Sequence, residues 1–172
     1  MDRPKRKENR LPEYDYSQPG CYFVTVCTAN REPIFWTAEP ISTNNVGADI
    51  IRPQDRLSEY GKIVDESIRK IPAVYSLVQV DNYVIMADHI HLLLRIVGDG
   101  GRMISAPTKT LSTVIGQMKR AVTKRCGCPV WQKSYHDHII RDDKDYWAAW
   151  AYIDTNPFHR KKESHSNTEE YP

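Results

Sequence analysis

Alternating side chains in residues 21–27, CYFVTVC, predict a β-strand early in the chain. The two faces of this strand would carry Tyr22, Val24 and Val26 on one side and Phe23, Thr25 and Cys27 on the other. Apolar runs at 77–80, 82–86 and 89–97 predict two strands, or three short ones, with a break at Ala87-Asp88. SYHDHIIR (134–141), which follows Trp131, predicts another strand, and short strands are expected at 34–36 and 49–51.

Three segments show the 3.6-residue period of amphipathic helices. The first has apolar residues at Leu57, Tyr60, Val64, Ile68 and Ile71, with Ser58 as its cap and Pro72 at its end. The second has its apolar stripe at Leu111, Val114, Ile115, Met118 and Val122, and Gly127 ends it. The third extends from about Asp143 to Asn156, just before Pro157.

The order of these elements predicts one α+β domain, an antiparallel sheet with helices packed on one face. A chain of 172 residues can bury a core without disulfides or a structural metal. We expect a basic N-terminal arm at 1–20, the folded domain at 21–160 and a polar tail at 161–172.

Composition favours a globular protein outside the membrane. Hydrophobic residues make up 40% and charged residues 27% of the chain, and the mean hydropathy is -0.60. The longest apolar run is far too short to span a membrane, and the N-terminus MDRPKRKENR lacks the apolar segment of a signal peptide. A cytoplasmic location is therefore expected.

Positive charge is concentrated in one part of a chain whose net charge is only +2. Residues 102–141 contain eight Lys and Arg and one acid, Asp137. Such a stretch fits either a solvated helix face or a surface for a polyanion such as nucleic acid. The candidate contacts are Lys119, Arg120, Lys124, Arg125 and Arg141, and behind them Arg3, Lys5, Arg6 and Lys7.

Two histidines, His89 and His91, lie in an apolar predicted strand. Because side chains alternate across a strand, both imidazoles leave the same face and can reach one cation. A single core histidine is usually only hydrogen-bonded, but two buried without a partner are costly. The sequence therefore favours a metal site here. A second pair, His136 and His138, has more polar surroundings and competes with it.

The third predicted helix brings a phenol and a carboxamide to one face. Tyr152 and Asn156 are one turn apart and neighbour Ala148 and Ala149, whereas Tyr146, Trp150 and Ile153 form the expected core stripe. From the helical wheel alone, Tyr152 is more simply interpreted as a packing residue.

Three motifs together resemble the single-tyrosine HUH transposases, especially the REP-associated tyrosine transposases. They are DNYVIMADHIHLLL (81–94), VWQKSYHDHIIR (130–141) and YWAAWAYIDTNP (146–157), and YFVTVCTANREPIF (22–35) and LSEYGKIVDESI (57–68) are similar too. The resemblance covers residues 20–160. It implies a ferredoxin-like fold. In this family Pro-Asn often precedes the first histidine, where this chain has Ala87-Asp88.

The resemblance implies a metal-dependent enzyme that nicks and joins single-stranded DNA beside hairpins. Tyr152 matches the nucleophile that forms a 5′-phosphotyrosine, and His89, His91 and Asn156 match the ligands of a divalent ion, expected to be Mg²⁺ or Mn²⁺. His136 and His138 are expected either to support the metal ligands from behind or to contact the DNA, and a homodimer is compatible with the family. Tyr135, Tyr146 and Tyr171 are competing nucleophiles that lack the matching neighbours.

Three alternatives stay open. The first is a catalytically silent module that binds a DNA or RNA hairpin, and the second is a rolling-circle initiator or relaxase, although those proteins usually carry further domains. The third is a zinc-bound structural protein built on Cys126, Cys128 and the histidines, but one residue between the cysteines does not match the usual spacing of zinc ligands. Two turn cysteines are the simpler interpretation.

Overall fold

The computed structural model describes residues 14–16, 18–37, 56–98 and 110–159. Their order is β1 (Gly20–Cys27), η1 (Ala29–Arg31), α1 (Glu59–Arg69), α2 (Ile71–Val74), β2 (Val78–Ile85), β3 (His89–Ile96), α3 (Leu111–Cys126), β4 (His136–Ile140) and α4 (Asp143–His159). The predicted strand at 49–51, the basic residues at 3–7, the tail at 161–172 and Tyr171 lie outside the described residues.

The four strands form one antiparallel sheet in the order β2-β3-β1-β4. With α1 between β1 and β2, and α3 between β3 and β4, this is the βαββαβ arrangement of a ferredoxin-like fold. The predicted α+β class is confirmed.

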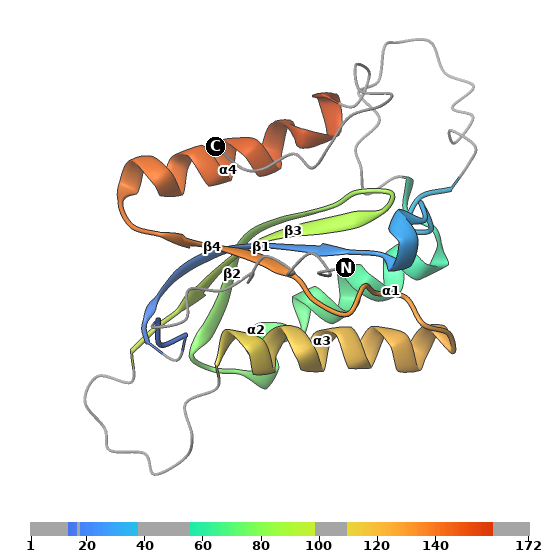
Figure 1. Cartoon of the computed structure of the whole chain (residues 1–172), viewed down its shortest axis with the longest axis horizontal. Helices are drawn as coiled ribbons and strands as arrows, with labels where there is room; N and C mark the ends of the chain where they lie inside the picture. Colours follow the sequence, from blue (N-terminus) through green and yellow to red (C-terminus); the bar gives the residue numbers. More distant parts are fainter. Residues whose placement is uncertain (1–13, 17, 38–55, 99–109, 160–172) are drawn as a thin grey trace, which may run out of the picture.

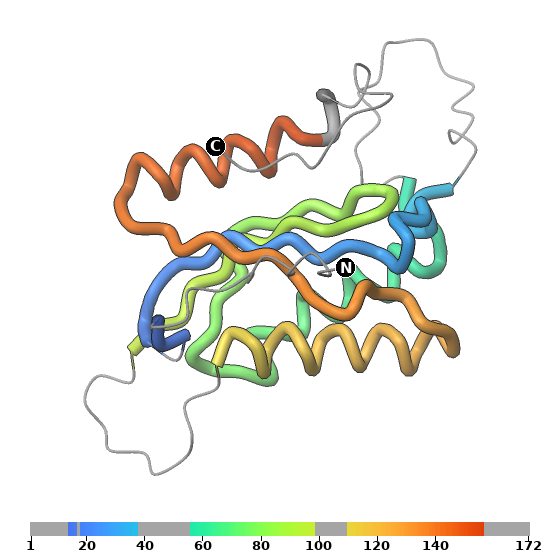
Figure 2. Tube along the Cα trace, in the orientation of Figure 1, coloured from blue at the N-terminus to red at the C-terminus, as the bar shows by residue number. Residues whose placement is uncertain are grey.

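The helices cover both faces of the sheet (Figure 1). Helices α1 and α3 lie on one face, where Val64, Ile68, Val114 and Ile115 join the main core. Helix α4 lies on the other face over a smaller cluster that includes Ala149 and Ile153. The expected placement on one face therefore holds for α1 and α3. Helix α4 departs from it, because the chain passes from β4 to the opposite side of the sheet (Figure 2). Residues that α4 brings to the sheet meet the strand side chains that α1 and α3 leave uncovered.

Local sequence signals explain the ends of α1 and α3. Ser58 caps α1 by accepting a hydrogen bond from the Gly61 amide at 3.2 Å, as predicted. Gly127 ends α3 with φ +70°, a left-handed conformation that glycine adopts without a steric penalty. Pro72 does not end the helical region, because proline is tolerated in the first turn of a helix, and here it is the second residue of α2.

Several predicted boundaries differ from those observed. The predicted runs at 77–80 and 82–86 fall in one strand, β2 (Val78–Ile85), which has a register shift between Val80 and Asn82. Residues 34–36 form no strand, and Trp36 makes only an isolated bridge to Leu57. Helix α4 continues past Pro157 to His159. Part of the predicted arm is docked, because Tyr14 and Tyr16 pack against the main core.

No helix within the described ranges is both long and apolar enough to cross a membrane.

Candidate active site

His89 and His91 lie side by side on the face of the sheet that α4 covers. Strand β3 is central, so its imidazoles are flanked by strands on both sides, and His91 is only 4% exposed. The two Nε2 atoms are 3.1 Å apart. The predicted convergence of the two rings is therefore confirmed.

The second nitrogen of each ring is held by a neighbouring residue. Nδ1 of His89 lies 2.7 Å from Oδ1 of Asp88, and Nδ1 of His91 lies 2.8 Å from Oγ1 of Thr25 on β1. A carboxylate only accepts, so the Nδ1–H of His89 donates to Asp88, which in the neutral ring leaves Nε2 as the acceptor. If His91 also donates from Nδ1, both Nε2 atoms face the same point as acceptors.

Burial keeps His91 in its neutral form. It holds the pKa of His91 well below the usual value, and the neighbouring His89 and Arg31 lower this pKa further. Neutral imidazole is the form that binds a metal ion, so the protein already disfavours the competing proton.

The two imidazoles fit a divalent ion. Two nitrogens about 2.1 Å from one ion and at a right angle to each other would be about 3.0 Å apart, close to the observed 3.1 Å. Among the described residues no group of three or more His, Cys, Asp and Glu is arranged to hold a metal. The third ligand that the resemblance implies, Asn156, is a carboxamide and so belongs to another residue type.

Helix α4 brings Tyr152 onto this pair of histidines. The Tyr152 ring is edge-on to His91 at 5.2 Å and to Phe23 at 5.7 Å between centroids. Phe23 in turn stacks on His91 at 5.2 Å. Asn156, one turn along the same helix, is 8% exposed and so also faces the sheet. Residues separated by about sixty positions in the sequence thus meet on one face.

The predicted core stripe of α4 is only partly right. Ile153 is buried, but Ala149 is fully buried as well, and Tyr146 and Trp150 are half-buried. A small side chain at 149 lets the helix backbone approach the sheet closely, which turns the face with Tyr152 inward. The alanine therefore serves the packing of α4 on the sheet.

The two competing tyrosines within the described residues, Tyr146 and Tyr135, have different surroundings. Tyr146 donates to Asp81 at 3.0 Å and lies under the Arg95 guanidinium, 5.5 Å from its ring, and burial and this hydrogen bond raise its pKa. Tyr135 is buried in the main core, on the other face. Only Tyr152 among these three contacts His91.

The second histidine pair lies on the same face, on the edge strand β4. His136 is paired across the strands with Thr25, the residue that holds His91, so the three residues form a row across the sheet. His138 pairs with Asp145 at the start of α4, at 2.9 Å from Nε2 to Oδ2. The second pair therefore lies on the same face as the first, with β1 between them.

The basic residues of α3 are not brought to this face. Lys119 donates to the carbonyls of Gln132, Lys133 and Ser134, and burial lowers its pKa. Arg125 pairs with Glu66 of α1 at 2.7 Å. These contacts hold neighbouring segments together.

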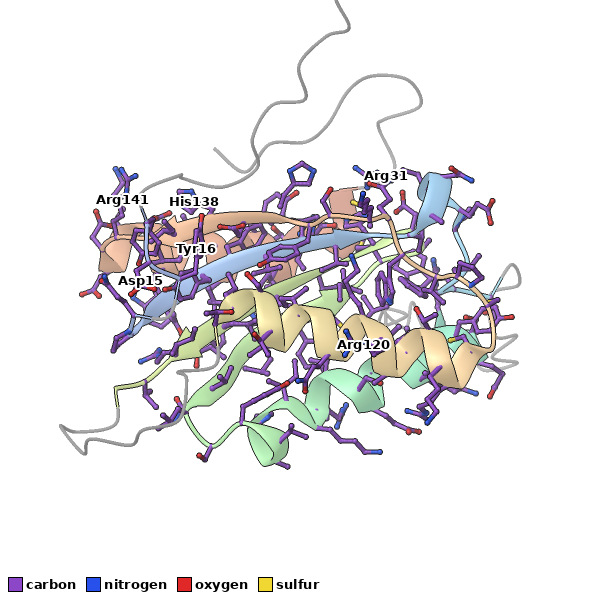
Figure 3. The ribbon with its side chains drawn as sticks, turned by 60° about the horizontal axis from the view of Figure 1, so that its bottom comes forward. Asp15, Tyr16, Arg31, Arg120, His138 and Arg141 are labelled. Atoms are coloured by element: carbon purple, nitrogen blue, oxygen red, sulfur yellow. The ribbon has the colours of Figure 1, made fainter. Side chains whose placement is uncertain are left out.

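Arg120 and Lys124 are exposed on α3, and Arg141 is exposed at the end of β4. Figure 3 shows Arg120 on the α3 layer and Arg141 with His138 along β4. Cys126 and Cys128 lie at the end of α3 as free thiols. Because no described cluster fits a metal ion around them, the structure gives the zinc alternative no support.

Sequence reasoning did not identify Thr25 or Phe23 as parts of the site. Both were correctly placed on one face of β1, but their meeting with His91 depends on the register between β1 and β3. Alternation places Thr25 and Phe23 on one face of β1, but only the pairing of β1 with β3 shows that this is the face with His91.

Known proteins resemble this chain in sequence and in fold. No model of a known family matches the chain. An uncharacterized protein of Haemophilus influenzae is 29% identical over 170 residues, 88% of each chain. Another protein of that organism, named "Putative REP-associated tyrosine transposase", is 25% identical over 150 residues, 83% of this chain and 73% of that protein.

A solved structure of a REP-associated tyrosine transposase bound to a REP hairpin has a similar fold. It matches with a TM-score of 0.61 and 20% identity, over 88% of this chain and 75% of that one. The resemblance to REP-associated tyrosine transposases that the motifs predicted is thus confirmed in sequence and in fold.

Proposed function

We propose that this protein is a transposase-type enzyme that cuts and rejoins single-stranded DNA at hairpins through a covalent 5′-phosphotyrosine on Tyr152. The observation that carries the proposal is the contact of Tyr152 with His91, whose Nε2 lies 3.1 Å from that of His89. A nucleophile and two converging metal ligands on one face are what phosphodiester cleavage by an activated tyrosine requires.

Each residue has a part that follows from its surroundings. The Tyr152 oxygen attacks phosphorus and forms an O–P bond while the bond to the 3′ oxygen breaks, and the phenolic proton is balanced by the proton gained at the departing 3′ hydroxyl. His91 and Phe23 hold the tyrosine ring from two sides. Reversal of the same step rejoins strands without an external energy source, because the phosphotyrosine conserves the bond energy.

His89, His91 and Asn156 would hold the divalent ion, Mg²⁺ or Mn²⁺. When bound, such an ion supplies a Lewis acid for the non-bridging oxygens of the attacked phosphate. Asp88 and Thr25 orient the imidazoles through their Nδ1 atoms, and the lowered pKa of His91 keeps its ring neutral.

The substrate is proposed to be a DNA hairpin with a single-stranded flank. The solved relative in fold is bound to a REP hairpin. In this chain the exposed Arg141, at the end of β4, would contact phosphates near the site, whereas the exposed Arg120 and Lys124 of α3, on the opposite layer, would contact phosphates farther along the hairpin. His136 and His138 would lie near the DNA strand, as residues of the edge strand beside the site.

A denaturing gel tests the proposal. Protein is incubated with Mg²⁺ or Mn²⁺ and hairpin oligonucleotides taken from the sequence flanking its own gene, labelled at the 5′ end in one set and at the 3′ end in another. A 5′-phosphotyrosine carries the 3′-labelled fragment on the protein and releases the 5′-labelled fragment. Tyr152→Phe and the double variant His89→Ala/His91→Ala should form no adduct, whereas Tyr146→Phe should.

Other results would redirect the proposal. An adduct that survives in Tyr152→Phe would mean that another tyrosine is the nucleophile. Tight binding of the hairpin with no adduct under any condition would instead favour the silent binding module.

A further inference from the structure

A strained turn follows β1 and ends next to the histidine pair. In η1 (Ala29–Arg31), Asn30 has φ 54° and Arg31 has φ 59°. Residues with a side chain rarely adopt this left-handed conformation, and two in succession are less common still. Such strain persists only where the surroundings impose it, and it concentrates at ligand-binding and catalytic sites.

Buried hydrogen bonds tie this turn to the loop that carries Asp88. The Thr28 amide donates to the Asp88 carbonyl at 2.9 Å, and the Thr28 hydroxyl lies 2.8 Å from the carbonyl of Glu32 and 2.9 Å from that of Asp88. Thr28 is fully buried. The backbone position of Arg31 is therefore fixed relative to the start of β3, where His89 begins the strand.

The Arg31 side chain reaches the same aspartate. Its Nη1 lies 3.6 Å from Oδ2 of Asp88, whose Oδ1 binds Nδ1 of His89 at 2.7 Å. The distance of 3.6 Å is an ion pair but is too long for a good hydrogen bond, and the Arg31 side chain is 45% exposed. The guanidinium thus lies beside the site with part of its surface, and so its N–H groups, accessible to a ligand.

Arg31 brings an exposed guanidinium to this corner of the site, whereas the carboxylate of Asp88 beside it is buried. The two imidazoles bear no charge when they serve as metal ligands, and the exposed basic residues of α3 belong to the opposite layer. Figure 3 shows Arg31 at the end of β1, well apart from Arg120 on α3. An arginine can bind two phosphate oxygens at once, which a point charge cannot do.

We propose that Arg31 is a phosphate-binding residue of this site, and that it binds the backbone phosphate at or next to the one that Tyr152 attacks. The inference rests on the proposed function, and it assigns the turn of η1 to holding the DNA strand in register with the nucleophile. The simpler alternative is that Arg31 only balances the charge of Asp88.

Binding measurements with single-phosphate changes separate these two roles. Affinity for the hairpin is measured in EDTA for the wild type and for Arg31→Ala, first with unmodified DNA and then with a neutral methylphosphonate at one backbone position after another. Arg31→Ala should weaken binding on the order of tenfold, because a charge-assisted hydrogen bond is lost. At one position near the cleavage point, the methylphosphonate should weaken wild-type binding but not weaken Arg31→Ala further.

Additive losses at every position would overturn the proposal, as would wild-type affinity in Arg31→Ala. A charge-balancing role predicts instead an altered Mn²⁺ affinity of the DNA-free protein with no coupling to any phosphate. If Arg31→Ala fails to fold, Arg31→Lys is used, which should bind with intermediate affinity and keep the coupling at the same position.

The matched control is Arg69→Ala. Arg69 is also an exposed arginine that pairs with an aspartate, Asp65, at 2.9 Å, but it belongs to α1 on the opposite face. It should show no coupling to any single phosphate. Because binding is measured in EDTA, the coupling is tested independently of cleavage. A wild-type protein that forms no adduct would contradict only the proposed function.

Discussion

Asp88 offers a sharp test of how the histidine pair is organised. Its carboxylate accepts the hydrogen bond from His89 Nδ1 at 2.7 Å, and the residue is only 8% exposed. Replacement by alanine removes an acceptor and a charge, whereas Asp88→Asn keeps an oxygen at the same place. Because the REP-associated family often has asparagine here, the second change should be the milder one.

The expected losses follow from the type of hydrogen bond. A hydrogen bond to a charged group contributes about 1.5–3 kcal/mol and a neutral one about 0.5–1.5 kcal/mol. At 1.4 kcal/mol for each factor of ten, Asp88→Ala should lower the metal affinity roughly 10- to 100-fold, which is the usual effect of losing such a partner. Asp88→Asn should lower it by a factor of about 5 to 10.

Binding of Mn²⁺ to the DNA-free protein, followed by electron paramagnetic resonance of the free ion, measures this directly. Asp143→Ala serves as the control, because Asp143 is an exposed acid in the first turn of α4. Urea denaturation checks that each variant is folded. Unchanged Mn²⁺ affinity in a folded Asp88→Ala protein would refute the idea that Asp88 orients His89 for metal binding.

Three further predictions concern packing, pH and DNA contacts. Ala149→Leu should lower the free energy of unfolding by about 1–3 kcal/mol and slow adduct formation, because Ala149 is fully buried between α4 and the sheet; urea denaturation and the adduct assay measure the two effects. Burial and the hydrogen bond to Asp65 raise the pKa of Tyr83 to about 12, above its unfolded value of about 10. The stability linked to this raised pKa is present below pH 10 and is lost as the pH rises to 12. The free energy of unfolding measured in urea should therefore fall more steeply over this range in the wild type than in Tyr83→Phe, and equal slopes would contradict this. The double variant Arg120→Ala/Lys124→Ala should weaken hairpin binding and lower its salt dependence by about two units, with an unchanged adduct rate at saturating DNA; an unchanged salt dependence would remove these residues from the DNA contacts.

Periodicity was sufficient to predict the sheet and the three main helices. The strand of residues 21–27, the cap at Ser58 and the stop at Gly127 all depend on local chemistry, and each is found where the sequence indicates it. His89 and His91 share a face because alternation in a strand is a local property as well.

Features that depend on tertiary contacts could not be predicted in the same way. Which face α4 covers is decided by where the chain leaves β4, and the inward turn of Tyr152 depends on the close approach at Ala149. The partnership of Thr25 with His91 is set by strand register, and the proximity of Arg31 to Asp88 by a strained turn. None of these leaves a periodic signal in the sequence.

The most direct test of the central claim is to identify the residue that carries the DNA. After reaction with hairpin DNA, nuclease trimming and digestion with trypsin, cleavage after Lys144 and Arg160 releases residues 145–160, which include both Tyr146 and Tyr152. Fragment-ion mass spectrometry then locates the attached nucleotide. We predict a 5′-phosphate bond to Tyr152; a nucleotide on Tyr146 or on another residue, or nicked DNA with no modified peptide, would contradict the account.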